Sequence, residues 1–183
     1  MRVRPFGPSL LTAAALALVG CGGDSTVEGS SYSFEVPDGW SQGSDEEVET
    51  IAPLADTFAQ GESVDGFATN INVIATGQVP AEVDLEEEVL AGAEALADDP
   101  ELFGLPPGTV VETVSDPEET ELGGEPAFEY AFETDTGDQV LLQRQITAIS
   151  PDGLAFTVTA SAVEDTTDRD AAFDQAVSSW EWE

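Results

Sequence analysis

The stretch from Pro126 to Val163 constrains the fold of this chain more than any other part. Apolar and polar residues alternate along it, and the two loops at 135–137 (Asp-Thr-Gly) and 151–153 (Pro-Asp-Gly) both end in glycine. The third residue of a three-residue hairpin loop adopts a left-handed conformation, which glycine tolerates best. The stretch is therefore predicted to form three consecutive antiparallel strands joined by two hairpins.

These hairpins also predict which residues share a face of the sheet. They place Thr134 opposite Asp138 and Ser150 opposite Leu154, because loop length fixes the register. One face is then mostly apolar and holds the even-numbered residues Phe128, Tyr130, Phe132, Val140, Leu142, Ile146, Phe156 and Val158. The opposite face holds Glu129, Gln143, Gln145, Thr157 and Thr159.

Arg144 is the exception on the apolar face, where it lies between Leu142 and Ile146. Ala160 is expected opposite it and leaves room for the long side chain. A guanidinium buried in a core has to be paired with a carboxylate. Arg144 is therefore either one half of an internal ion pair or a residue that lines a pocket and meets the anionic head group of a ligand.

Strands are also predicted elsewhere in the chain. Apolar and polar residues alternate at 32–36 and 67–75, and a further strand is expected at 109–114. Residues 41–49 are predicted to be an acidic loop, because four of these nine residues, Asp45, Glu46, Glu47 and Glu49, are acidic.

Two helices complete the predicted domain. The first begins after Asp84, a good cap with Glu87 three residues on, and the second begins after Thr167. Their apolar stripes are Leu85, Val89, Ala93 and Leu96, and then Phe173, Ala176, Val177 and Trp180. The expected fold is a single α+β domain over 31–183, with a mostly antiparallel β-sheet flanked by two main helices.

The charge of the chain excludes one class of partner. It has 38 Asp and Glu, only 4 Lys and Arg, and no histidine. Binding of nucleic acid depends on Lys and Arg that neutralise phosphates, so we expect no nucleic-acid partner. The acidity is interpreted first as a device for solubility or salt tolerance, and second as a sign of cation binding.

The beginning of the chain carries the pattern of an export signal. Arg2 and Arg4 precede an apolar run at 10–19, which is shorter than the ~20 residues that a membrane-spanning helix needs. The run ends in Leu-Val-Gly-Cys at 18–21, which resembles the bacterial lipobox. That resemblance implies cleavage before Cys21 and a diacylglycerol on its thiol.

The domain organisation and location follow from this leader. We predict a lipoprotein signal peptide at 1–20 and a flexible tether at 21–30, where small and polar residues dominate. The acyl chains on Cys21 are then expected to bind the cell membrane and to hold the domain at its extracytoplasmic face.

Several short motifs resemble a known family. They are Tyr-Ser-Phe-Glu-Val-Pro-Asp-Gly-Trp at 32–40, Asn-Ile-Asn-Val at 70–73, Leu-Gly-Gly-Glu-Pro-Ala at 122–127 and Ser-Ser-Trp at 178–180. Together they resemble the LpqN-type actinobacterial lipoproteins, which in turn are similar to the wider PsbP-like α+β fold. The resemblance implies a membrane-anchored extracytoplasmic domain without a defined catalytic site.

Few catalytic or metal-binding schemes can be assembled from these residues. Without histidine or lysine there is no Ser–His, Cys–His or Ser–Lys pair, so we predict no enzyme and no cofactor. Oxygen ligands for calcium remain an alternative. The candidate clusters are Glu133, Asp135 and Asp138 in one hairpin, and Glu164, Asp165, Asp168 and Asp170 before the last helix.

The sequence therefore predicts a non-enzymatic binding or adaptor domain of the cell envelope. Its expected partner is an envelope protein or a small ligand of unknown identity. The alternative is a ligand- or calcium-binding module that uses Arg144 or one of the acidic clusters.

Overall fold

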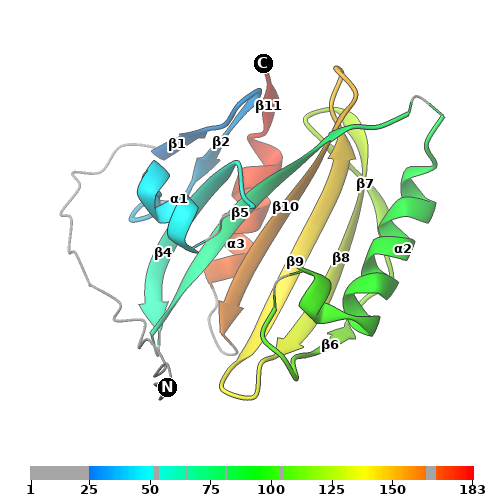
Figure 1. Ribbon diagram of the computed structural model, residues 1–183. Helices are drawn as coiled ribbons and strands as arrows, with labels where there is room; N and C mark the ends of the chain where they lie inside the picture. The colour runs from blue at the N-terminus through cyan, green and yellow to red at the C-terminus, as the bar shows by residue number, and fades with distance from the viewer. Residues whose placement is uncertain (1–24, 52–53, 65, 81, 104, 164–167) are drawn as a thin grey trace, which may run out of the picture.

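The computed structural model describes residues 25–51, 54–64, 66–80, 82–103, 105–163 and 168–183 (Figure 1). The helices are α1 (Asp45–Ile51), α2 (Leu85–Asp98) and α3 (Asp168–Ser178), with a short 3-10 helix η1 (Pro100–Phe103). The strands are β1 (Ser25–Glu28), β2 (Tyr32–Val36), β3 (Ser41–Gln42), β4 (Thr57–Val64), β5 (Phe67–Gln78), β6 (Val110–Thr113), β7 (Glu118–Leu122), β8 (Glu125–Asp135), β9 (Val140–Ile149), β10 (Leu154–Val163) and β11 (Glu181–Trp182).

The described strands form two antiparallel sheets. The main sheet has eight strands in the order β3-β4-β5-β10-β9-β8-β6, with β7 paired to β8 beside β6. The small sheet has three strands in the order β1-β2-β11, so the two ends of the described chain meet on β2. The fold is α+β and mostly antiparallel with two main helices, as the sequence predicts.

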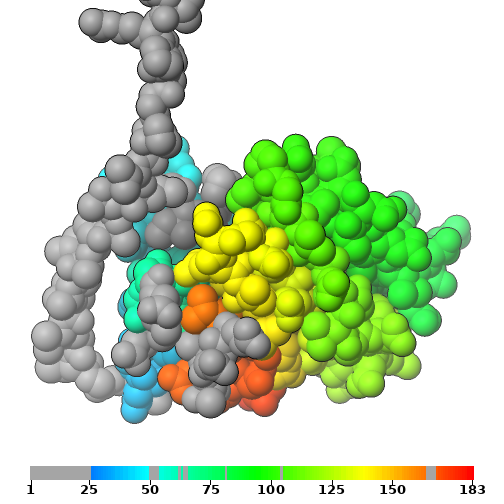
Figure 2. Space-filling model, turned by 90° about the horizontal axis from the view of Figure 1, so that it is seen from below, coloured from blue at the N-terminus to red at the C-terminus, as the bar shows by residue number. Residues whose placement is uncertain are grey.

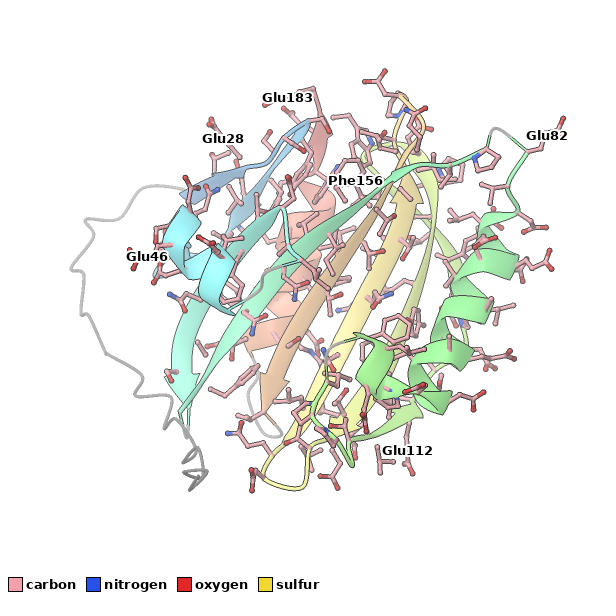
Figure 3. The ribbon with its side chains drawn as sticks, in the orientation of Figure 1. Glu28, Glu46, Glu82, Glu112, Phe156 and Glu183 are labelled. Carbon is pink, nitrogen blue, oxygen red and sulfur yellow. The ribbon has the colours of Figure 1, made fainter. Side chains whose placement is uncertain are left out.

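One face of the main sheet carries the larger hydrophobic core. α3 and the small sheet lie on this face, behind the main sheet in Figure 1. Phe156 of β10 and Phe173 of α3 are fully buried there, and the ring of Tyr32 stacks on that of Trp180 with centroids 4.4 Å apart. Figure 3 shows Phe156 inside the outline of the sheet, near the start of β10, whereas the labelled glutamates project from the periphery.

The opposite face carries α2 and a smaller core. Val89 and Leu96 of α2 pack against Val111 of β6 and against Tyr130 and Phe132 of β8. α2 therefore covers one side of this face, over β8 and β6. Seen from below in Figure 2, the segment of α2 and η1 (green) and that of α3 (red) lie on opposite sides of the central strands (yellow).

The two α-helices of the first half begin at side-chain caps. Asp84 accepts a hydrogen bond from the backbone N–H of Glu87, as predicted for the start of α2. At α1 the backbone N–H of Ser44 donates to the carboxylate of Glu47 at 2.8 Å, and the backbone N–H of Glu47 donates to the hydroxyl of Ser44 at 3.4 Å. This reciprocal cap forms a helix where the sequence analysis expected an acidic loop at 41–49, so that expectation is wrong.

The predicted register between β9 and β10 is confirmed, whereas the predicted register between β8 and β9 is wrong. The Pro-Asp-Gly loop closes as predicted, with Ser150 opposite Leu154 and Gly153 at φ 80°. In the other hairpin Thr134 lies opposite Leu141 instead of Asp138. The loop is longer because the hydroxyl of Thr136 bonds both the C=O and the N–H of Gln139. A shift by an odd number of residues moves Phe128, Tyr130 and Phe132 to the α2 face.

The tether prediction at 21–30 is also wrong for the part that the structure describes. Residues 25–28 form β1, which pairs with β2 from Ser25 opposite Val36 to Glu28 opposite Ser33. Val27 is completely buried in the larger core, and the backbone N–H of Ser30 donates to Asp56. A buried apolar side chain fixes this short segment despite its polar neighbours. Residues 21–24 lie outside the described residues.

Candidate functional site

A cavity of about 500 Å³ lies between α2 and the main sheet. Residues of β5, β8, β9 and β10 form its floor, α2 forms its roof, and the connection from β5 to α2 closes one end. It exists because α2 packs on β8 and β6 and leaves the face of β5, β9 and β10 beside it open. A volume of this size is within the ~300–1,000 Å³ that is usual for small-molecule sites.

The floor of the cavity changes from polar to apolar along the strands. At one end Tyr130, Gln145 and Thr159 lie side by side on β8, β9 and β10. Two residues further along β9 and β10 come Thr147 and Thr157. The next pair is apolar, namely Ile149 and Ala155.

The polar end of the floor is a row of uncharged hydrogen-bonding groups. The hydroxyl of Thr159 donates to the amide oxygen of Gln145 at 3.4 Å, and the hydroxyls of Thr147 and Thr157 are 3.2 Å apart. Burial raises the pKa of Tyr130 to about 12, while its hydrogen bond with Gln145 acts in the opposite direction. Tyr130 therefore keeps its proton at neutral pH, and the whole row is neutral.

The apolar end of the cavity lies under the start of α2. Val79, Pro80 and Val83 of the connection line it. Farther round the wall are Leu54 and Phe103, two residues that are 70% and 46% exposed. Large apolar side chains that stay exposed at the edge of a cavity are typical of a site that takes up apolar surface from a ligand.

The cavity holds almost no charge. Glu88 of α2 is the charged residue among those that line it in the described chain, and it is exposed. The chain has 4 Lys and Arg, of which Arg2 and Arg4 lie outside the described residues. The other two, Arg144 and Arg169, lie on the opposite face of the sheet beside α3.

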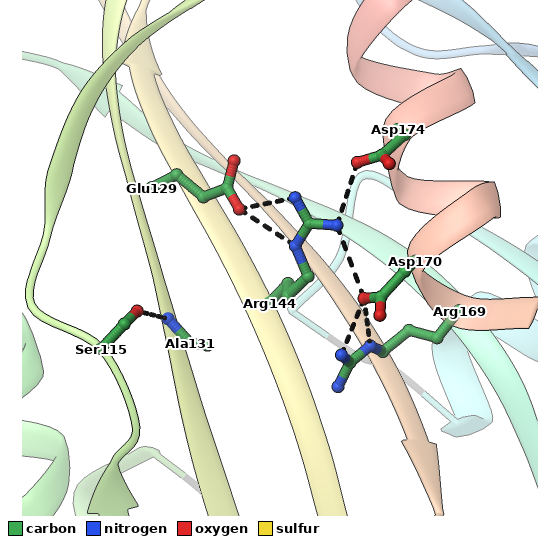
Figure 4. A network of polar contacts seen from close by, with 7 residues as sticks. All are labelled: Ser115, Glu129, Ala131, Arg144, Arg169, Asp170 and Asp174. Atoms are coloured by element: carbon green, nitrogen blue, oxygen red, sulfur yellow. Dashed lines mark hydrogen bonds and ion pairs between the residues drawn. The ribbon is translucent and has the colours of Figure 1, made fainter. Parts of the chain in front are cut away.

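Arg144 lies opposite Ala160 on the face that the sequence predicts, and it is paired (Figure 4). Its Nε and Nη2 both donate to Oε1 of Glu129, at 3.0 and 2.7 Å. Its Nη1 donates to Asp174 at 2.9 Å and to Asp170 at 3.4 Å, both on α3. Glu129 reaches Arg144 because of the shifted register of β8, which places it on this face.

The carboxylates around Arg144 already neutralise its charge within the protein. Burial acts to lower the pKa of Arg144, but the hydrogen bonds with Glu129 and Asp174 outweigh it, so the pKa is raised. The guanidinium carbon lies 4.5 Å from the centroid of the Phe173 ring, and 21% of the side chain is exposed. Of the two alternatives for Arg144, the geometry therefore corresponds to the internal ion pair, with three carboxylates already on its nitrogens.

The acidic clusters do not gather into a metal site in the described part of the chain. No group of three or more Asp, Glu, His or Cys residues there could hold a metal ion, so Glu133, Asp135 and Asp138 are not brought together as ligands. Asp135 instead accepts a hydrogen bond from the backbone N–H of Gly137 at 2.7 Å, which stabilises the loop. Of the second cluster, Glu164 and Asp165 lie outside the described residues.

Cys21 also lies outside the described residues, so its lipidation stays a prediction. Among the helices that the structure describes, none is both long and apolar enough to cross a membrane.

The cavity is not predicted from the sequence, although a signal is present. The alternation of residues predicts only that Gln145, Thr157 and Thr159 share the polar face of the sheet. In a chain with 38 acids, however, the cavity-side residues of β9 and β10 include no Asp or Glu. A face of amides, hydroxyls and aliphatic side chains in so acidic a chain is a sign that the face is not ordinary solvent-exposed surface.

Two solved structures resemble the whole described arrangement. Cyanobacterial PsbP (CyanoP) from Synechocystis sp. PCC 6803 is 18% identical, with a TM-score of 0.63 over 93% of this chain and 99% of that one. The fold is PsbP-like. The second structure with this PsbP-like fold is LpqN, described as involved in cell envelope biogenesis of Mycobacterium tuberculosis. It is 21% identical, with a TM-score of 0.56 over 87% of this chain and 90% of LpqN.

The other comparisons find no relative. No family model matches the chain, and no curated protein matches it. The PsbP-like fold predicted from the motifs is confirmed, and at such low identity the likeness shows the fold alone.

Proposed function

We propose that this chain is a lipid-anchored, extracytoplasmic binding protein of the cell envelope, which holds a small apolar molecule in the cavity under α2 without transforming it. The observation that carries the proposal is the cavity itself, about 500 Å³ in volume, with an apolar end and a neutral polar row. A site built in this way can desolvate a ligand and orient it with a few hydrogen bonds.

The remaining parts of the proposal have separate support. The basic, apolar and Leu-Val-Gly-Cys segments before Asp24 support export and acylation of Cys21. The chain has no histidine and no lysine, which removes the Ser–His, Cys–His and Ser–Lys pairs of nucleophilic catalysis. LpqN, which shares the fold, is described as involved in cell envelope biogenesis. An adaptor role toward an envelope protein stays a prediction from the sequence.

Gly92 offers a direct test of the cavity. It lies on α2 among the lining residues, and a Cβ added there meets no atom within 4 Å. Gly92→Trp therefore fills the cavity with an indole while the helix backbone stays in place. Ala91→Trp is the matched control, because Ala91 is exposed and lies on the same helix outside the cavity.

The assay is titration with Nile red, an uncharged fluorophore that brightens in apolar surroundings. The chain carries Cys21→Ser, so that no acyl chain of its own competes for the cavity. We expect saturable binding that Gly92→Trp abolishes and Ala91→Trp leaves unchanged. Equal binding by the two tryptophan variants, or no binding by the parent, rules the proposal out.

The anchor is tested in cells. Cys21→Ser should release the protein from the membrane fraction, because so acidic a surface is repelled by anionic lipids. If this variant still sedimented with membranes in high salt, the anchoring part of the proposal would be wrong.

A further inference from the structure

We infer that the cavity under α2 selects uncharged amphiphiles, with the uncharged head on the row of Tyr130, Gln145 and Thr159 and the apolar chain toward Ile149 and Ala155, and that it rejects anionic ones. This inference rests on the proposed function, since it assumes that the cavity binds a ligand.

The orientation follows from the gradient along the floor. The side chains change from amide and hydroxyl at Gln145 and Thr159, through the hydroxyls of Thr147 and Thr157, to the hydrocarbon of Ile149 and Ala155. A ligand with one polar end keeps all of its hydrogen bonds only when that end lies on the polar row. The reverse orientation buries its polar end among Val79, Pro80 and Val83, which offer no side-chain partner, and the hydroxyl of Thr76 at this end already donates to the backbone C=O of Ala155.

The polar row still has hydrogen-bonding capacity for a head group. The hydroxyl of Thr159 uses its proton toward Gln145, and its oxygen can still accept a hydrogen bond. The pair formed by Thr147 and Thr157 uses one of its two protons, so the second can be donated. Hydroxyl, ester and amide heads, which both donate and accept or only accept, match this set.

The rejection of anions follows from the charges. Burial of an ionised carboxylate or phosphate needs a cation or a charged hydrogen-bond donor. In the described chain the cations are Arg144 and Arg169, which lie across the sheet and are paired with acids of β8 and α3. The charged residue at the cavity is Glu88, which repels an anion further. Among the described residues on the cavity side, no cation therefore compensates a negative head.

The test compares two displacers of Nile red that share a twelve-carbon acyl chain, each below its critical micelle concentration. 1-Monolauroylglycerol is uncharged, and laurate is anionic at pH 8. We expect monolauroylglycerol to displace the dye at a concentration at least about tenfold lower than laurate. Equal potency, or a preference for laurate, overturns the inference. Absence of Nile red binding to the parent instead refutes the proposed function, so the two failures are distinguishable.

Two variants that each raise the net charge by one locate the head group. Gln145→Lys puts a cation into the polar row, and Glu88→Gln removes the negative charge at the rim. We expect laurate to gain clearly more affinity from Gln145→Lys than from Glu88→Gln. An equal gain would mean that only the general field of the protein disfavours laurate, and it would overturn the orientation.

A third variant keeps the inference testable if Gln145→Lys does not fold. Thr159→Val removes one hydroxyl at constant shape. It should weaken monolauroylglycerol by about two- to tenfold, the range for one neutral hydrogen bond, after correction for the measured affinity of the variant for Nile red. An unaltered affinity for monolauroylglycerol contradicts the inference.

Discussion

The ion-pair cluster around Arg144 should contribute measurably to stability. Arg144 donates two hydrogen bonds to one oxygen of Glu129, whose side chain is 27% exposed, and a charged hydrogen bond contributes ~1.5–3 kcal/mol. Asp174 and Asp170 are 67% and 57% exposed, so each adds only ~0–1 kcal/mol. The contact of the guanidinium with Phe173 adds ~0.5–1 kcal/mol.

These contributions are not additive, because removal of Arg144 leaves Glu129 in contact with water. We therefore expect Arg144→Ala to lower the free energy of unfolding by about 2–3 kcal/mol, which is less than the ~3–5 kcal/mol of a fully buried pair. Arg144→Met keeps an unbranched apolar stem in place of the arginine stem, although it loses the guanidinium contact with Phe173, and should lose about 1–2 kcal/mol. Urea melts at pH 7 measure both values.

A double-mutant cycle separates the ion pair from the packing. Glu129→Gln should destabilise the parent but have almost no effect in the Arg144→Met background, which gives a coupling energy of about 1–2 kcal/mol. A coupling energy below ~0.5 kcal/mol would refute the reasoning, because it would mean that Glu129 and Arg144 stabilise the fold independently.

Three further predictions concern the whole domain. Gly123→Ala should lower the free energy of unfolding in urea melts by about 2 kcal/mol or more, because φ is +58° and the new Cβ would lie 2.6 Å from Nε1 of Trp182. Gly124→Ala is the control and should cost clearly less, because its φ is +84° but no atom lies within 4 Å of the new Cβ. Equal losses in the two variants would contradict this packing. Removal of Arg2 and Arg4 with the leader leaves two cations and 38 acids, so the thermal midpoint of the mature chain should rise between 0.1 and 1 M NaCl; a flat midpoint would show that repulsion is already compensated. Burial acts to raise the pKa of Asp170, but the interactions with Arg169 and Arg144 outweigh burial, so the pKa is lowered. The ionised Asp170 therefore stabilises the fold fully above its ordinary pKa of 3.8, and this stabilisation is lost as the pH falls below that value. The stability difference between the parent and Arg144→Met should accordingly shrink below about pH 4 in melts at constant ionic strength, and a constant difference would contradict the assignment.

The sequence predicts the strands and main helices well because their signals are local. Alternation over 126–163, the Asp84 cap and the glycine of the 151–153 loop each act within a few residues, and all appear in the structure. The Ser44–Glu47 cap of α1 is equally local and could have been recognised from its Ser-Asp-Glu-Glu sequence.

The parts that could not be predicted depend on tertiary arrangement or on loop details. The register of β8 depends on which of two loop lengths the side chains of Asp135 and Thr136 stabilise, and both fit the same residues. The partner of Arg144 depends on that register. The cavity depends on where α2 lies over the sheet, which its apolar stripe alone does not determine.

The small sheet joins segments from opposite ends of the chain. Tyr32 of β2 pairs with Trp182 of β11, about 150 residues later, and the ring of Tyr32 stacks on Trp180. Contacts over so long a stretch are expected to close late in folding, because the entropy cost of closing a loop grows with its length. A protein threaded through a membrane from its N-terminus therefore completes this sheet only after residue 182 has emerged. Under the proposed export, a chain whose last residues have not yet left the channel lacks β11 and the stack of Tyr32 on Trp180, so this part of the larger core closes only when translocation is complete.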